Sequence, residues 1–122
     1  MRRENPDFLE YCYRRVWTAL GGSEEHAQVM ARCISYGDRD GKLTQGLGVF
    51  EVPVLLARAG TMEMQARPEI VGSGKNWSIR DGRSSSGQWA FTLATEKAID
   101  QAREHAMAIA MVRDFYDAGA FG

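Results

Sequence analysis

The most informative stretch of this 122-residue sequence covers residues 86–105 and reads SGQWAFTLATEKAIDQAREH. Ser86 suits the start of a helix, because a serine hydroxyl accepts a hydrogen bond from an unpaired N–H group of the first turn. The pattern predicts a helix from Gly87 to His105. Its apolar positions recur at helical spacing, at Phe91, Ala94, Ala98, Ile99, Ala102 and Ala106.

Short apolar segments flank this helix on both sides. Residues 62–71 and 76–80 are rich in strand-compatible side chains and are separated by Gly72-Ser-Gly74. Residues 108–112 form a short apolar run directly after the helix, which favours a buried strand. We therefore expect a β-β-α-β unit.

The N-terminal half predicts three helices, over residues 6–20, from Ser23 to a stop near residues 37–41, and over residues 47–59. Pro53 is expected to bend or divide the third, because proline lacks a backbone N–H. The expected inner stripes of the first two are Leu9, Cys12, Val16, Ala19 and Leu20, and then Ala27, Met30, Ala31 and Ile34. The sequence thus predicts an α+β fold in a single domain, residues 1–122, with three helices before the β-β-α-β unit.

The charge balance argues against nucleic-acid binding. Fifteen basic and 16 acidic side chains give a net charge of -1, so no strong positive field is present. We interpret the cluster Arg2, Arg3, Arg14 and Arg15 as a solvated face. The longest apolar runs are far shorter than the ~20 residues of a membrane helix, and no export signal is recognisable. The expected location is cytoplasmic, without membrane contact.

The cysteines and histidines do not indicate a catalytic or metal-binding site. Cys12 and Cys33 are expected to be reduced residues on buried helix faces, since two isolated cysteines without an export signal rarely form a bridge. His26 and His105 lie in helical patterns, which favours surface or helix-end roles. No metal site is predicted, because the cysteine and histidine spacings differ from those of zinc sites.

Three motifs agree in order and spacing with one enzyme family. They are Asp40-Gly-Lys-Leu-Thr-Gln-Gly46, then Asp81-Gly-Arg-Ser-Ser-Ser-Gly-Gln88 with its following helix, and finally the loop from Asp114 to Gly122. They resemble motifs of the type 2 malate/L-lactate dehydrogenases, a family with ureidoglycolate and sulfolactate dehydrogenases and cyclic imino acid reductases. The resemblance covers the N-terminal part of such enzymes and implies their α+β fold.

The chain departs from the family pattern at its reactive positions. The family's first loop reads approximately R-G-H-x-S-H-G-x-x-R, and here Gln45 replaces the second histidine and Val49 the arginine. Asp117 replaces the histidine of the later loop. Glutamine cannot deliver a proton at neutral pH, and Asp117 could act as an acid only if burial raised its pKa. The resemblance therefore implies a degenerate site or pocket at Lys42, Thr44, Gln45 and Asp117, with no catalytic residue assigned.

The resemblance also implies a nicotinamide cofactor. Family members continue past the glycine-rich loop into a cofactor-binding region, and this sequence offers neither a G-x-G-x-x-G after a strand nor a P-loop. We expect no cofactor for the chain alone, and NAD(P)H if another chain completes it. The serines before Gly87 are expected to cap a helix rather than to bind an anion.

Three functions remain open. The preferred one is a non-catalytic accessory or assembly subunit that binds a protein partner or forms a homo-oligomer, with Ala118, Ala120 and Phe121 as candidate contact surface. The alternatives are an NAD(P)H-dependent oxidoreductase of 2-oxo/2-hydroxy acids or cyclic imino acids, and a small-ligand binding protein that uses Lys42, Thr44 and Gln45.

Overall fold

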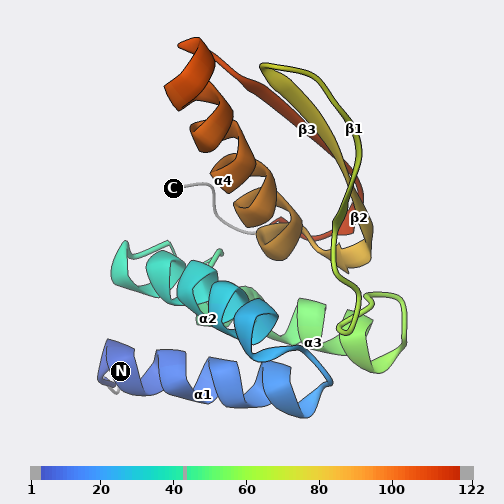
Figure 1. Ribbon diagram of the computed structural model, residues 1–122. Helices are drawn as coiled ribbons and strands as arrows, with labels where there is room; N and C mark the ends of the chain where they lie inside the picture. Colours follow the sequence, from blue (N-terminus) through green and yellow to red (C-terminus); the bar gives the residue numbers. More distant parts are fainter. Residues whose placement is uncertain (1–3, 43, 119–122) are drawn as a thin grey trace.

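The structure is a computed structural model that describes residues 4–42 and 44–118. Figure 1 shows a lower layer of helices and an upper layer in which one long helix lies against a sheet. The order of the elements confirms the predicted α+β fold. They are α1 (Pro6–Ala19), α2 (Glu24–Arg39), the 3-10 helix η1 (Leu47–Val49), α3 (Glu51–Arg58), β1 (Glu69–Ser73), β2 (Trp77–Ser86), α4 (Gly87–His105) and β3 (Ile109–Tyr116).

The lower layer is held together by a core between α1, α2 and the segment after α3. The α2 stripe is buried as predicted, whereas on α1 the fully buried side chains are Tyr13 and Trp17. The stripe predicted for α1 is at most half-buried. Leu9 and Leu20 of that stripe pack against the core, but the fully buried positions are taken by the two large aromatic residues. The buried members of this core are Tyr13, Trp17, Ala27, Met30, Ala31, Ile34, Met62 and Met64.

The third predicted helix is divided, as expected for a segment that contains Pro53. Residues 47–49 form η1, and α3 begins at Glu51. Pro53 is buried in the first turn of α3. There its missing N–H removes no intrahelical hydrogen bond, because the first turn's N–H groups have no helical acceptor.

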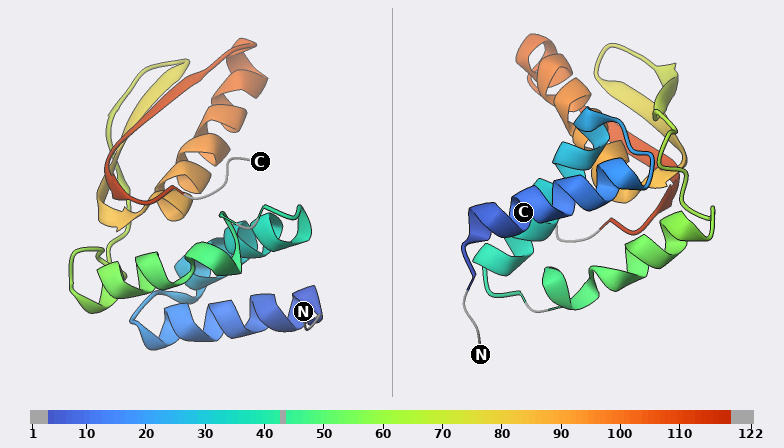
Figure 2. Two further views of the ribbon diagram at one scale, coloured as in Figure 1. Left: turned by 180° about the vertical axis from the view of Figure 1, so that it is seen from behind. Right: turned by 90° about the horizontal axis from the view of Figure 1, so that it is seen from below.

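The sheet has the strand order β1-β2-β3. β1 pairs with β2 antiparallel, and β2 pairs with β3 in parallel through the α4 crossover. α4 covers one face of this sheet (Figures 1 and 2). Arg80 Nη2 donates to the carbonyl oxygen of Leu93 at 3.3 Å, and Gln101 Nε2 donates to the carbonyl oxygen of Gly74 at 2.8 Å. Gln101 Nε2 also lies 3.2 Å from the carbonyl oxygen of Trp77, so these contacts fix α4 against β2 and the turn before it.

The predicted strand over residues 62–71 is wrong in its first part. Only Glu69–Ser73 is a strand, and residues 61–68 form a connection whose Met62 and Met64 are buried in the helical core. Met62 and Met64 are both buried and two residues apart, which is the spacing of inward-facing residues in a strand. β2 and β3 are also longer than predicted, because strand pairing continues beyond Arg80 to Ser86 and beyond Val112 to Tyr116.

Several local predictions are confirmed. The hydroxyls of Ser23 and Ser86 cap α2 and α4, where they accept from the backbone N–H of His26 and Trp89. Cys12 and Cys33 are free, although only half-buried. Among the described residues, no helix is both long and apolar enough to cross a membrane.

Candidate functional site

Lys42, Thr44 and Gln45 lie on one loop directly after α2. Lys42 Nζ is 2.9 Å from Asp40 Oδ2 and 4.9 Å from the centre of the Tyr36 ring. The hydrogen bond to Asp40 raises the pKa of Lys42 above its ordinary value. Lys42 therefore stays charged at neutral pH, and Thr44 beside it is exposed. The loop presents a fixed cation and an amide, not a proton donor suited to neutral pH.

Asp38 holds this loop in place. Its Oδ2 accepts from the Tyr13 hydroxyl at 2.6 Å, and its Oδ1 accepts from the backbone N–H of Leu47 at 2.7 Å. Burial, together with the hydrogen bond to Asp38, raises the pKa of Tyr13, so its hydroxyl remains a donor. The position of the loop thus depends on a contact with α1.

Asp117 follows β3 and is exposed. Its backbone carbonyl accepts from the N–H of Gly87 at 2.9 Å, and its Oδ2 accepts a long hydrogen bond of 3.5 Å from Gln88 Nε2. The burial that would make Asp117 an acid is not found. Of the predicted surface residues near it, Ala118 is half-buried, whereas positions 120 and 121 lie outside the described residues.

A pocket of about 560 Å³ between α2 and α4 links these two regions. Tyr36, which contacts Lys42, lies at one side, and Gln88, which contacts Asp117, lies at another. Lys42 and Asp117 thus each contact a residue that lines this pocket, whereas none of the four predicted site residues lines it. The residues that line it are Val29, Arg32, Cys33, Tyr36, Gln88, Phe91, Thr92, Thr95, Glu96 and Ala118.

Gln88 is a residue of this pocket that sequence reasoning did not identify as a site residue. It is 4% exposed, and its Oε1 is buried without a hydrogen-bond partner among the described residues. Burial of a hydrogen-bond acceptor without a donor costs free energy. A donor group placed next to this oxygen would therefore be stabilising. Its place at the end of the Asp81–Gln88 motif was the available signal.

The charges of the pocket balance each other. Arg32 comes from α2 and Glu96 from α4, while Val29 and Phe91 supply apolar walls. Burial raises the pKa of the Cys33 thiol, which keeps it in the neutral, weakly nucleophilic form. The pyrophosphate of a nicotinamide dinucleotide needs several cations or backbone donors. A single arginine opposed by a glutamate does not fit that group.

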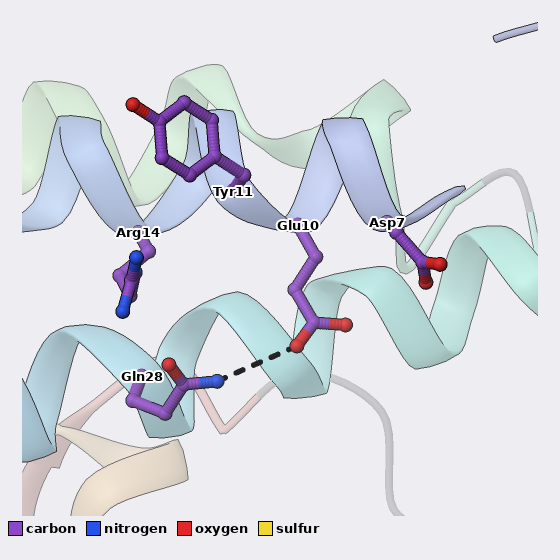
Figure 3. Close-up of a pocket in the computed structure, with 5 residues that line it drawn as sticks. All are labelled: Asp7, Glu10, Tyr11, Arg14 and Gln28. Atoms are coloured by element: carbon purple, nitrogen blue, oxygen red, sulfur yellow. Dashed lines mark hydrogen bonds between the residues drawn. The ribbon is translucent and has the colours of Figure 1, made fainter. Parts of the chain in front are cut away.

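A second hollow lies between α1 and α2 and is lined by Asp7, Glu10, Tyr11, Arg14 and Gln28 (Figure 3). Its volume of about 190 Å³ is below that of ordinary ligand pockets, about 300–1,000 Å³. Gln28 Nε2 donates to Glu10 Oε1 across the helices, at 3.4 Å. The hollow is therefore part of the α1–α2 contact. In the described residues, no group of three potential metal-ligating side chains is found.

The predicted surface role of His26 is wrong, whereas His105 is exposed at the end of α4 as expected. His26 is fully buried, with Nδ1 3.0 Å from the carbonyl oxygen of Met64 and Nε2 2.7 Å from Ser86 Oγ. Because a carbonyl only accepts, Nδ1 carries the proton and Nε2 accepts from the serine hydroxyl. His26 joins α2, the 61–68 connection and α4. Without access to solvent, the pair is structural.

The buried state of His26 predicts a loss of stability in mild acid. Burial lowers the pKa of His26, an effect that its contact with Met64 only partly opposes. The unfolded chain binds the proton more readily than the folded protein does. The contribution of neutral His26 to the free energy of unfolding is therefore complete above pH 6.5 and falls as the pH decreases below it. The expected slope is up to about 1.4 kcal/mol per pH unit. Urea unfolding between about pH 7.5 and pH 5 measures it.

The matched variants are His26→Gln and His105→Gln, which remove the two histidines of the sequence one at a time. His26→Gln is expected to flatten the pH dependence, and His105→Gln to keep it. An equal slope in both variants would show that carboxylates, not His26, cause the acid sensitivity.

Comparison with known proteins places the chain in a family. The family model described as malate/L-lactate dehydrogenase matches residues 5–122. The malate dehydrogenase of Pyrococcus abyssi is 29% identical over 108 residues, which are 88% of this chain and 30% of that protein.

Two solved structures have the same fold. Malate dehydrogenase from Entamoeba histolytica has a TM-score of 0.94 at 22% identity, over 97% of this chain and 33% of that one. Delta1-piperideine-2-carboxylate reductase from Pseudomonas syringae has a TM-score of 0.90 at 24% identity, over 98% of this chain and 36% of that one. The chain thus spans about a third of the length of these relatives. It belongs to the malate/L-lactate dehydrogenase family and corresponds to one part of its members.

Proposed function

We propose that this segment is a non-catalytic module of the dehydrogenase family that acts in assembly, through contacts with another polypeptide. The observation that carries the proposal is Gln45, an amide at the position where the family pattern has a proton-donating histidine. The neighbouring groups do not replace it: Lys42 is held in an ion pair with Asp40, and Asp117 is exposed. Large apolar side chains left exposed on several elements support a role in contacts.

A second candidate function is the binding of a small ligand between α2 and α4. The unsatisfied Oε1 of Gln88 favours it, because a ligand with an N–H or O–H group would supply the missing donor after a small side-chain shift. Such binding would raise the melting temperature of the protein without turnover. Val29→Trp, which fills the pocket from α2, is the matched variant expected to abolish that rise.

The remaining alternative is an oxidoreductase of 2-oxo/2-hydroxy acids or cyclic imino acids, with NAD(P)H, completed by another chain. The test compares the protein with the double variant Gln45→His, Asp117→His. We expect both to leave NADH and NADPH absorbance at the blank rate with pyruvate or a cyclic imino acid. The reason is that histidines alone do not supply the cations that a dinucleotide needs. Turnover by either protein would overturn the proposal.

The native mass of the protein isolated from its own cells under mild conditions tests the assembly role directly. Mass beyond that of one chain, 13.6 kDa, is expected, and the other polypeptide is identified from the same complex. A monomer with neither partner nor turnover would leave ligand binding as the better proposal.

A further inference from the structure

His26 lies at the boundary between the two layers and contacts both of them. Its Nδ1 donates to the carbonyl oxygen of Met64, which belongs to the core of the lower layer. Its Nε2 accepts from the hydroxyl of Ser86, at the junction of β2 and α4 in the upper layer (Figure 1). One imidazole ring therefore joins the layers, as a donor toward one and as an acceptor toward the other.

The environment of this ring excludes water. His26 and Ser86 are fully buried, and the His26 ring stacks on that of Trp89, with ring centres 5.6 Å apart and planes at 15°. The three partners of the ring, Met64, Ser86 and Trp89, all lie well inside the described part of the chain. Additional polypeptide could only bury the ring further. Its burial thus does not depend on where the sequence ends.

The charged side chains on the surrounding segments offer no stabilising partner for a positive charge on His26. Glu25 Oε2 is 3.0 Å from Arg67 Nη1, and the Arg67 guanidinium lies over the Trp89 ring at 5.5 Å. The charged side chain that shares Trp89 with His26 is therefore a cation, which opposes a second positive charge. The other charged side chains nearby are exposed or half-buried: Glu24 on α2, Glu63 on the connection, Arg80 and Arg83 on β2, and Asp117 after β3.

Protonation of His26 would weaken its bond to the upper layer and preserve its bond to the lower one. With a second proton, both ring nitrogens are donors. The carbonyl oxygen of Met64 accepts in either state. The hydroxyl hydrogen of Ser86, in contrast, would point at the new N–H group and would have to turn away. The oxygen of Ser86 already accepts from the backbone N–H of Trp89 at 3.3 Å, as the cap of α4.

The other contacts across this boundary are few among the described residues. Val29 of α2 packs with Trp89 and Leu93 of α4, a cluster of three buried residues, whereas the core of the lower layer has eight. The N–H of Glu63 in the connection donates to the carbonyl oxygen of Ser84 in β2 at 2.8 Å. Regions with few buried apolar contacts open at a lower free energy than the core does.

We propose that His26 is a pH-sensitive switch, whose protonation in mild acid releases the junction of β2 and α4 from α2 while the lower layer stays folded. The open state binds a proton that the closed state excludes, because burial lowers the pKa of His26 only when the layers are closed. Opening therefore becomes more favourable as the pH falls below about 6.5, the ordinary value for histidine. The switch is a movement inside this chain and is independent of the proposed assembly role.

Hydrogen exchange of two backbone amides separates this opening from unfolding of the whole protein. The N–H of Glu63 crosses the boundary, whereas that of Met30 lies in the middle of α2, with its side chain fully buried in the lower layer. We expect the protection factor of Glu63 to be at least about tenfold below that of Met30 at pH near 5.5. Between about pH 7.5 and pH 5.5 the Glu63 value is expected to fall by up to about tenfold.

His26→Gln is the test variant, and it is expected to remove the pH dependence of the Glu63 protection factor. His105→Gln is the matched control, because His105 is exposed at the end of α4, and it is expected to keep that dependence. If circular dichroism shows that His26→Gln does not fold, His105→Gln decides, since His26 is then the last histidine of the sequence. A fall that begins near pH 6.5 belongs to it, because carboxylates titrate near pH 4.

Three results would overturn the switch. Equal protection of Glu63 and Met30 at each pH would mean that only global unfolding exposes His26. A Glu63 protection factor that does not change with pH would mean that opening does not involve protonation. A fall of the same size in a folded His26→Gln variant would assign the effect to other groups.

Discussion

Replacement of Trp17 by alanine is expected to lower the free energy of unfolding by about 3–5 kcal/mol, the usual range for a buried tryptophan. Trp17 is fully buried, and its ring meets that of Phe50 edge-on at 5.2 Å. Its indole N–H has no hydrogen-bond partner among the described residues. The side chain thus contributes through packing, and its loss leaves a cavity at the centre of the helical core.

Urea unfolding measures this loss, with Trp77→Ala as the matched control. Trp77 is 40% exposed at the sheet, so the same truncation is expected to cost clearly less. Low protein concentration keeps any self-association out of the comparison. Similar midpoints for the two variants would mean that the α1–α2 core is not the main source of stability.

The helices were predicted most reliably, because their signals are local. Ser23 and Ser86 are caps in the structure, and the α2 stripe is buried as its spacing indicated. The error on α1 has the same physical origin. Cys12 and Val16 of the predicted stripe each lie one position before the buried Tyr13 and Trp17, and this aromatic pair was left out of the stripe.

The connection between the layers, residues 61–68, could not be predicted from local sequence patterns. Met62 and Met64 belong to the helical core, although their spacing is that of a strand. His26 is buried because residues far away in sequence, Met64 and Ser86, provide its hydrogen-bond partners. Neither contact follows from the residues near His26. Burial of a polar side chain depends on such distant partners.

The sequence predicted where the candidate loop lies, but not the pocket beside it. The motif around Lys42 and Gln45 correctly indicated a loop after α2, and the structure places that loop beside Tyr36 of the α2–α4 pocket. The pocket itself depends on the angle between two helices that are nearly fifty residues apart in sequence. Its unsatisfied acceptor on Gln88 becomes visible only in three dimensions. Motif spacing indicates chemistry, whereas the packing of elements determines the shape of a site.

Replacement of Gly37 by alanine is expected to displace this loop and to lower the free energy of unfolding by about 1–3 kcal/mol, the range for overpacking. A Cβ at position 37 would overlap the backbone of Gln45, 2.6 Å from its carbonyl carbon and 2.9 Å from the nitrogen of Gly46. Backbone atoms cannot turn away as a flexible side chain would. Alanine favours a helix over glycine by up to about 1 kcal/mol, so a net loss would have to come from the collision.

Hydrogen exchange of the loop amides gives the readout specific to the site. The N–H of Lys42 donates to the carbonyl oxygen of Gly37 at 2.8 Å, and the N–H of Leu47 donates to Asp38. Both are expected to exchange faster in Gly37→Ala, because the loop must move away from α2. In the control Gly72→Ala the nearest atom is the Trp77 ring at 3.5 Å, an ordinary contact, and the loop amides are expected to keep their rates. Unchanged exchange in Gly37→Ala would mean that the loop is not held by close packing on α2, and that Lys42 and Gln45 owe their position to Asp38 alone.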